Sequence, residues 1–269
     1  MSLHNLSLIR ENVDLNEINL EDIVFDDRDG NIKYAMKMYF VIADQFKQEL
    51  SKEIGTKRPW DSRLSISREK FIELYERIYN WASMLDEKEL DQWVYCPGPP
   101  VNGPDLSRLW RFNEAEWSVE TVPLEEIGVW PRYFGVAHSV TTGNVIETAE
   151  IIEGYLNKNK NEDKIVTQKA IDVANSMTEY VDLISLLFPL ILIKTGKNTR
   201  RPFENSNKEE VQDMGLEYIS TVYETEDGAG RAVALALLGV SNVKCFVGSG
   251  LQETYPTKEE EADLRAYVS

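Results

Sequence analysis

Apolar residues recur at intervals of three and four along most of the chain, which is the spacing that places them on one face of an α-helix. This spacing predicts a helix that begins near Lys33 and ends at Gly55, a residue suited to a helix C-terminus. A second helix is expected after Ser67, whose hydroxyl can cap it, and a shorter one over residues 87–95.

The same pattern continues in the second half of the chain. Further helices are expected over residues 106–117, 123–128, 131–140, 145–156, 166–186, 207–222, 228–240 and 257–268. The most apolar stretch, residues 181–193, is expected to be a buried helix that Pro189 kinks or ends. Residues 243–247, VKCFV, are compatible with a short strand or another helical turn. Because strict alternation of apolar and polar residues is nearly absent, we predict an all-α fold.

A run of proline and glycine, CPGPPVNGP at residues 96–104, interrupts the helical pattern. Prolines remove backbone donors and bias the preceding residues away from helix, so regular structure should end here. We therefore predict three parts: an N-terminal arm over residues 1–30, an N-terminal helical lobe over residues 31–97, and a C-terminal helical lobe over residues 98–269.

Composition narrows the class of protein. The 269 residues carry a net charge of −17, which on average repels nucleic acid and anionic membranes. Two cysteines and two histidines are too few for a disulfide framework or a Cys/His zinc site, and they favour a reducing compartment. With no basic segment leading into a long apolar run, we expect no secretion signal, no membrane partner and a cytoplasmic location. We expect no cofactor and no metal.

One segment, KTGKNTRR at residues 194–201, is a dense basic cluster. Such a cluster in an acidic protein can bind phosphate or an acidic partner, although an exposed, solvated loop explains it as well. Arginines also lie near tryptophans at positions 108–132, an arrangement that can stack single-stranded bases or simply fill the core. The candidate anion- or RNA-binding residues are Arg108, Arg111, Arg132, Lys194, Lys197, Arg200, Arg201 and Arg231.

Three other features carry weaker chemistry. Residues 227–231, DGAGR, can present helix N–H groups and Arg231 to an anion, but no strand is predicted before them, so a turn and a helix start is favoured. The carboxylates of Asp26, Asp27 and Asp29 can bind Mg²⁺ or Ca²⁺, yet a solvated turn explains them. His138 can act as a general base, but a lone histidine is more often a packing residue. We assign no catalytic residue.

Three hypotheses about function remain. The leading one is a non-enzymatic protein that acts through protein–protein contacts and self-association, because no catalytic constellation is visible and a homo-oligomer or protein partner suits its amphipathic segments. The second is a nucleocapsid or coat-type protein that packages single-stranded RNA between two lobes. The third is an enzyme that uses carboxylates and a divalent metal, with His138 in support.

Overall fold

The computed structural model covers the whole chain and describes residues 20–25, 30–55, 66–96, 104–129, 144–157, 186–194, 221–252 and 256–268. Its helices are η2 (Leu20–Asp22), α2 (Ile32–Ile54), α3 (Arg68–Ala82), α4 (Glu87–Tyr95), α5 (Leu106–Glu114), η4 (Leu124–Glu126), α6 (Val145–Asn157), α10 (Ala229–Leu237) and α11 (Lys258–Val268). Its strands are β1 (Glu116–Pro123), β2 (Ile127–Gly128), β3 (Ile191–Lys194), β4 (Tyr223–Asp227) and β5 (Asn242–Ser249).

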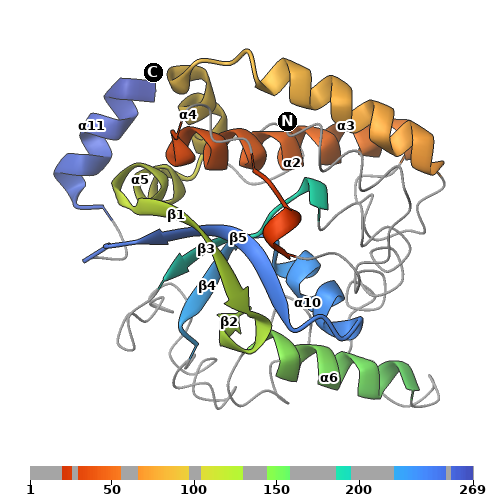
Figure 1. Cartoon of the computed structure of the whole chain (residues 1–269). Coiled ribbons are helices and arrows are strands. Elements are labelled where there is room, and N and C mark those ends of the chain that lie inside the picture. Colours follow the sequence, from red (N-terminus) through yellow and green to blue (C-terminus); the bar gives the residue numbers. More distant parts are fainter. Residues whose placement is uncertain are drawn as a thin grey trace.

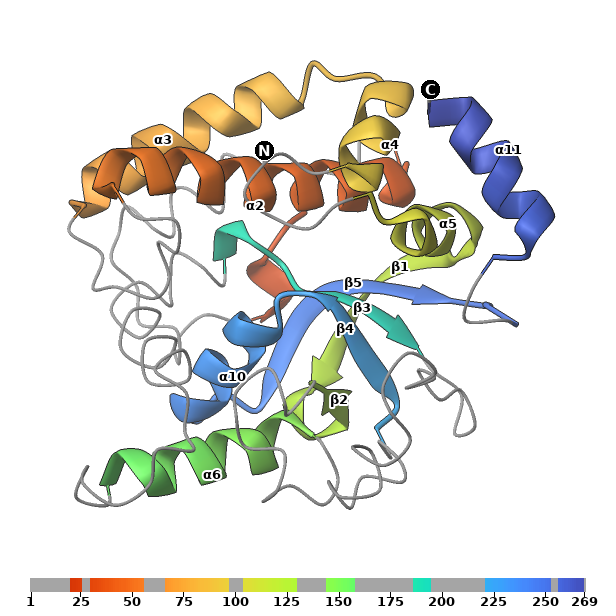
Figure 2. The same cartoon turned by 180° about the vertical axis from the view of Figure 1, so that it is seen from behind.

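The five strands form one mixed sheet in the order β1-β5-β3-β4-β2. The outer pair β1 and β5 is antiparallel, β5 and β3 are parallel, β3 and β4 are antiparallel, and β4 and β2 are parallel. Helices α2, α3, α4, α5 and α11 lie on one face of the sheet, and α6 and α10 lie on the other (Figures 1 and 2). The described part of the chain is therefore a three-layer α/β structure.

The prediction of an all-α fold is wrong, and the central strands explain why. A strand covered by helices on both faces is apolar on both sides, so it lacks the alternation that marks a strand in sequence. β3, with the sequence ILIK, is such a strand, and the helix predicted over residues 181–193 is a strand at this end. The helix predicted over 106–117 ends at Glu114, before β1, and the segment 123–128 holds the 3-10 helix η4 and strand β2 in place of a continuous helix.

Predictions that rested on local signals are confirmed. The side chain of Ser67 accepts a hydrogen bond from the backbone of Lys70 and caps α3. Gly55 ends α2 in the left-handed conformation that glycine favours, with φ of 67°. Thr257 and Glu260 exchange two hydrogen bonds at the start of α11. The short strand considered for residues 243–247 is part of β5.

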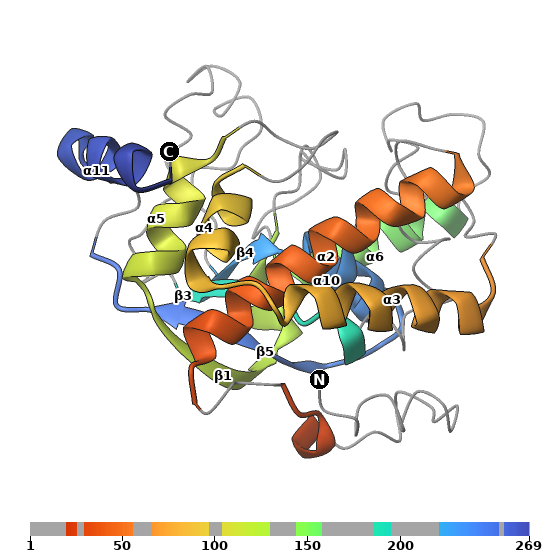
Figure 3. The same cartoon turned by 90° about the horizontal axis from the view of Figure 1, so that it is seen from above.

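Aromatic side chains join helices α2 and α3 to the sheet. Phe246 of β5 packs against Tyr39 of α2, with ring centroids 5.6 Å apart. Phe188, just before β3, lies 5.0 Å from the ring of Phe46 in α2 and 5.2 Å from that of Tyr75 in α3. Seen from above, α2 and α3 run side by side across the sheet (Figure 3). This packing holds the segment before β3 and the middle of β5 against α2 and α3.

The division into an arm and two lobes stays a prediction. Most of residues 1–30 and the whole segment 97–103 lie outside the described residues. Among the described residues, no helix is both long and apolar enough to cross a membrane.

Candidate functional site

Four of the eight candidate cationic residues lie in described parts of the chain, and β4 is the common neighbour of three of them. Arg111 reaches β4 from α5, Arg231 from α10, and Lys194 from β3. The fourth, Arg108, lies over the ring of Phe40 with its guanidinium carbon 5.2 Å from the ring centroid. Arg132, Lys197, Arg200 and Arg201 lie outside the described residues.

Arg111 forms a buried ion pair with Glu226 of β4. Its Nε lies 2.7 Å from Oε1 of Glu226, and its Nη2 donates to Oε2 at 2.9 Å. The two side chains are 11% and 2% exposed. The charge-assisted hydrogen bond from Nη2 and the close ionic contact of Nε tie α5 to the sheet. Arg111 therefore already has an anion as its partner.

Arg231 stands in the first turn of α10, directly after β4. Its Nη2 donates to Asp227 at 2.7 Å and to the carbonyl of Pro189 at 3.1 Å, so it joins β4, α10 and the start of β3. The turn between strand and helix is Gly228, with φ of 95°. The expectation that no strand precedes residues 227–231 is wrong, because β4 ends at Asp227. The segment is a strand–glycine–helix connection.

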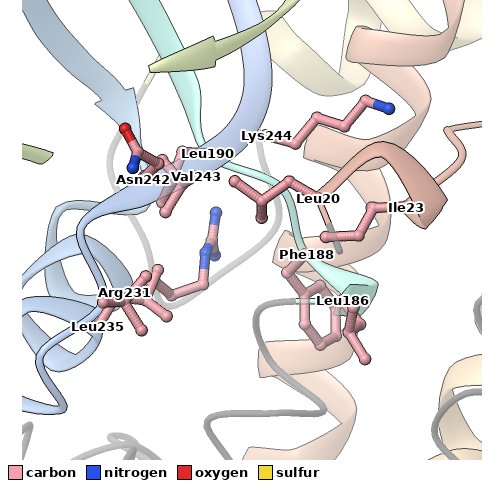
Figure 4. Close-up of a pocket in the computed structure, with 11 residues that line it drawn as sticks. Leu20, Ile23, Leu186, Phe188, Leu190, Arg231, Leu235, Asn242, Val243 and Lys244 are labelled. Carbon is pink, nitrogen blue, oxygen red and sulfur yellow. The ribbon is translucent and has the colours of Figure 1, made fainter. Parts of the chain in front are cut away.

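An apolar pocket opens beside Arg231 (Figure 4). Its cavity volume is about 50 Å³, well below the roughly 300–1,000 Å³ of drug-sized ligand sites, so it can enclose only part of a ligand. Leu20 of η2, with Leu186 and Phe188 before β3, forms one side, and Leu235 of α10 faces them across the opening. Eight of the eleven lining residues are apolar and none is acidic, although the chain carries a net charge of −17.

The polar residues of the pocket differ in how they face it. The side chain of Arg231 extends toward Leu190 and Val243, within the pocket wall. The chain of Lys244 lines the pocket with its carbon atoms, while its ammonium group points away (Figure 4). Nε of Arg231 is buried and has no hydrogen-bond partner in the described part of the chain. Arg231 is thus the cationic side chain of the pocket wall, and it is paired with Asp227.

A second group of polar side chains gathers around Tyr223 in β4. Burial raises the pKa of Tyr223, and the carboxylates of Glu120 and Glu126 raise it further, so its hydroxyl remains a proton donor at neutral pH. Nζ of Lys194 lies 5.7 Å from the centre of its ring. A tyrosine held protonated beside a carboxylate is a stable hydrogen-bond donor, and no titration of it is expected near pH 7.

The metal hypothesis gains no support from the described residues. Within them, no three histidine, cysteine, aspartate or glutamate side chains come together in a way that could hold a metal ion. Asp26, Asp27, Asp29 and His138 lie outside the described residues, so their predicted roles stay predictions.

No known protein family matches the chain, and neither does any curated protein or solved structure. Its function must therefore be argued from the site. Arg231 was among the residues that the sequence suggested, but the apolar lining was not. That lining comes from three stretches far apart in the chain, residues 20–23, 186–190 and 231–244, and only the small residues and arginine after Asp227 gave a local signal.

Proposed function

We propose that the chain is a non-enzymatic binding protein whose pocket takes a small amphipathic carboxylate, a molecule with an apolar body and one anionic head. The observation that carries the proposal is the buried Nε–H of Arg231, which has no acceptor in the described part of the chain, at the wall of an apolar pocket. A buried donor without an acceptor costs about 1–3 kcal/mol, and a ligand carboxylate would supply the acceptor.

The charge of the lining supports an anion over a cation. A ligand ammonium would enter a pocket that offers one cation and no acidic side chain. A carboxylate would meet Arg231, whose guanidinium is always charged and presents donors in a fixed plane. The apolar lining then favours an alkyl body, since each buried methylene contributes about 0.8 kcal/mol.

The proposal is tested with decanoate and decanol, which share an alkyl chain and differ in the head group. We expect isothermal titration calorimetry to show that decanoate binds at least tenfold more tightly than decanol. Equal affinities would show that Arg231 does not bind the carboxylate. If neither compound binds, the proposal is overturned.

Two variants make the location of the site testable. Leu20→Trp places a large side chain in the pocket from η2, outside the sheet, and is expected to abolish decanoate binding. Met84→Trp is the matched control, because Met84 is 76% exposed and does not line the pocket. Binding that survives Leu20→Trp would show that decanoate binds elsewhere.

The proposal includes a cytoplasmic location, which suits a chain with one exposed and one buried free cysteine. Binding of RNA has weaker grounds. Arg111 is largely buried against its partner Glu226, so it does not lie on a surface where a phosphate backbone could reach it.

A further inference from the structure

Strand β1 forms one edge of the sheet. It pairs with β5 through eight consecutive residues, from Glu116 opposite Ser249 to Pro123 opposite Asn242, without a shift in register. On its other side, no strand among the described residues pairs with it. A regular edge strand presents a row of backbone N–H and C=O groups that can pair with another strand.

The two edges of the sheet differ in how they resist such pairing. Native proteins protect edge strands by keeping them short or by adding lysine, proline or a bulge. The opposite edge, β2, has only two residues. β1 has eight residues, contains no lysine or arginine, and has its one proline at the last position, Pro123. Of the two edges, β1 is therefore the one suited to pairing.

We propose that two copies of this chain pair through β1, antiparallel, about a twofold axis that passes through Val119. This proposal is independent of the ligand-binding function. The order of residues in β1 allows two copies of the strand to pair in one register and disfavours the two neighbouring registers.

Symmetry restricts the register first. Residues opposite each other in a sheet must point to the same face, and side chains alternate between faces along a strand. A twofold axis normal to the sheet keeps each face in place, so it must pass through a residue and not between two residues. An axis through Val119 or Glu120 leaves seven residues of β1 paired, whereas an axis through Ser118 or Thr121 leaves five.

Charge then selects among them. An axis through Ser118 places Glu116 opposite Glu120 of the second copy, and an axis through Glu120 places that residue opposite itself. Like charges directly opposite destabilise a sheet. An axis through Val119 places Ser118 opposite Glu120, and Glu116 opposite Val122. This register pairs seven residues of each strand, 116–122, with no glutamate opposite another.

The same register suits the apolar residues. Val119 and Trp117 are partly buried and pack against the core. They lie on the face of the sheet that α5 covers, where the ring of Trp117 contacts that of Phe112. The axis brings the two Val119 side chains together on that side, and β-branched residues are favoured as cross-strand neighbours. The result is a continuous sheet of ten strands.

Each copy brings a net charge of −17, so the copies repel each other over long distances. Salt screens this repulsion more than it affects backbone hydrogen bonds at the interface, because the Debye length falls from about 10 Å at 0.1 M to about 3 Å at 1 M salt. The dimer should therefore become tighter as the salt concentration rises. Light scattering over a range of protein concentrations, in 0.05 M and 0.5 M NaCl, measures this.

Disulfide cross-linking tests the register. In a Cys96→Ser background, which removes the exposed native thiol and keeps the buried Cys245, Val119→Cys is oxidised and examined on a non-reducing gel. Directly opposite residues have Cα atoms about 4.5–5.5 Å apart, which fits a disulfide. We expect a covalent dimer.

Thr121→Cys in the same background is the matched control. In the proposed register two copies of residue 121 are offset by four residues, about 13 Å along the strand, which is too far for a disulfide. A strictly monomeric protein in both salts would overturn the proposal, and so would cross-linking of Thr121→Cys as efficient as that of Val119→Cys. Either result leaves the decanoate measurements intact, so the two proposals fail separately.

Discussion

Removing the negative charge of Glu226 should destabilise the protein far more than breaking an exposed ion pair does. The Glu226 side chain is 2% exposed and holds Arg111 through two contacts of 2.7 and 2.9 Å. In Glu226→Gln the guanidinium stays charged, because arginine does not lose its proton in proteins. Breaking one side of a buried pair costs about 3–5 kcal/mol, and since glutamine keeps one acceptor we expect about 3 kcal/mol.

The assay is urea unfolding at pH 7, supported by thermal unfolding. For a domain of this size, 1 kcal/mol corresponds to about 2–4 °C, so Tm should fall by roughly 6–12 °C. Glu53→Gln is the matched control, because Glu53 and Lys70 form a contact of 2.6 Å whose side chains are 43% and 54% exposed. An exposed pair contributes no more than about 1 kcal/mol, so this control should change little.

A double variant separates the cost of an unpaired charge from the worth of the pair. Arg111→Met with Glu226→Met removes both charges and leaves apolar side chains of similar length. It should be more stable than Glu226→Gln, since no buried charge is then left alone. The reasoning is refuted if Glu226→Gln loses no more stability than Glu53→Gln, or if the double variant is the least stable of the three.

Three further predictions concern groups that burial or backbone conformation perturbs. Burial raises the pKa of Asp44 above its usual 3.8. The contribution of this carboxyl to stability is therefore present below pH 3.8 and lost as the pH rises through the folded-state pKa. In urea unfolding, Asp44→Asn should be more stable than the parent at pH 7 and equally stable at pH 3.5. Gly228→Ala should cost about 1–3 kcal/mol more than Gly239→Ala, because both have positive φ but only at Gly228 would the new carbon lie 2.6 Å from a leucine methyl carbon. Burial raises the pKa of the Cys245 thiol, so mass spectrometry after iodoacetamide should show Cys96 modified and Cys245 protected until urea unfolds the chain. Equal stabilities of Asp44→Asn and the parent at both pH values, equal costs of the two alanines, or alkylation of native Cys245 would each contradict the corresponding argument.

The sequence predicted what depends on neighbouring residues and missed what depends on distant ones. Ser67 and Gly55 mark their helix ends through bonds within four residues, so the sequence shows them directly. β3 is recognisable as a strand only when its partners are known. Those partners, β4 and β5, lie on either side of it in the sheet but come later in the sequence. Within its own segment, the apolar run of β3 is equally compatible with a buried helix.

The candidate site divides in the same way. Arg231 and Asp227 are four residues apart, a spacing that the sequence makes visible as an ion pair across one turn. The pair of Arg111 and Glu226 spans 115 residues and has no local signal. The pocket has none either, because leucine in η2 and leucine in α10 look like ordinary core residues until the sheet brings them together.

The pocket and the β1 edge meet at β5. Residues 242–244 line the pocket, and the same three residues pair with residues 123–121 of β1. Any movement of this ladder on dimerisation would change the pocket, and linkage requires that decanoate would then change the dimer by the same free energy. The ladder is regular over all eight pairs, however, and pairing at the free edge of β1 leaves its bonds to β5 in place. Decanoate should therefore bind the cross-linked Val119→Cys dimer and the uncross-linked protein with equal affinity, and a difference beyond threefold would show that β1 moves when it pairs.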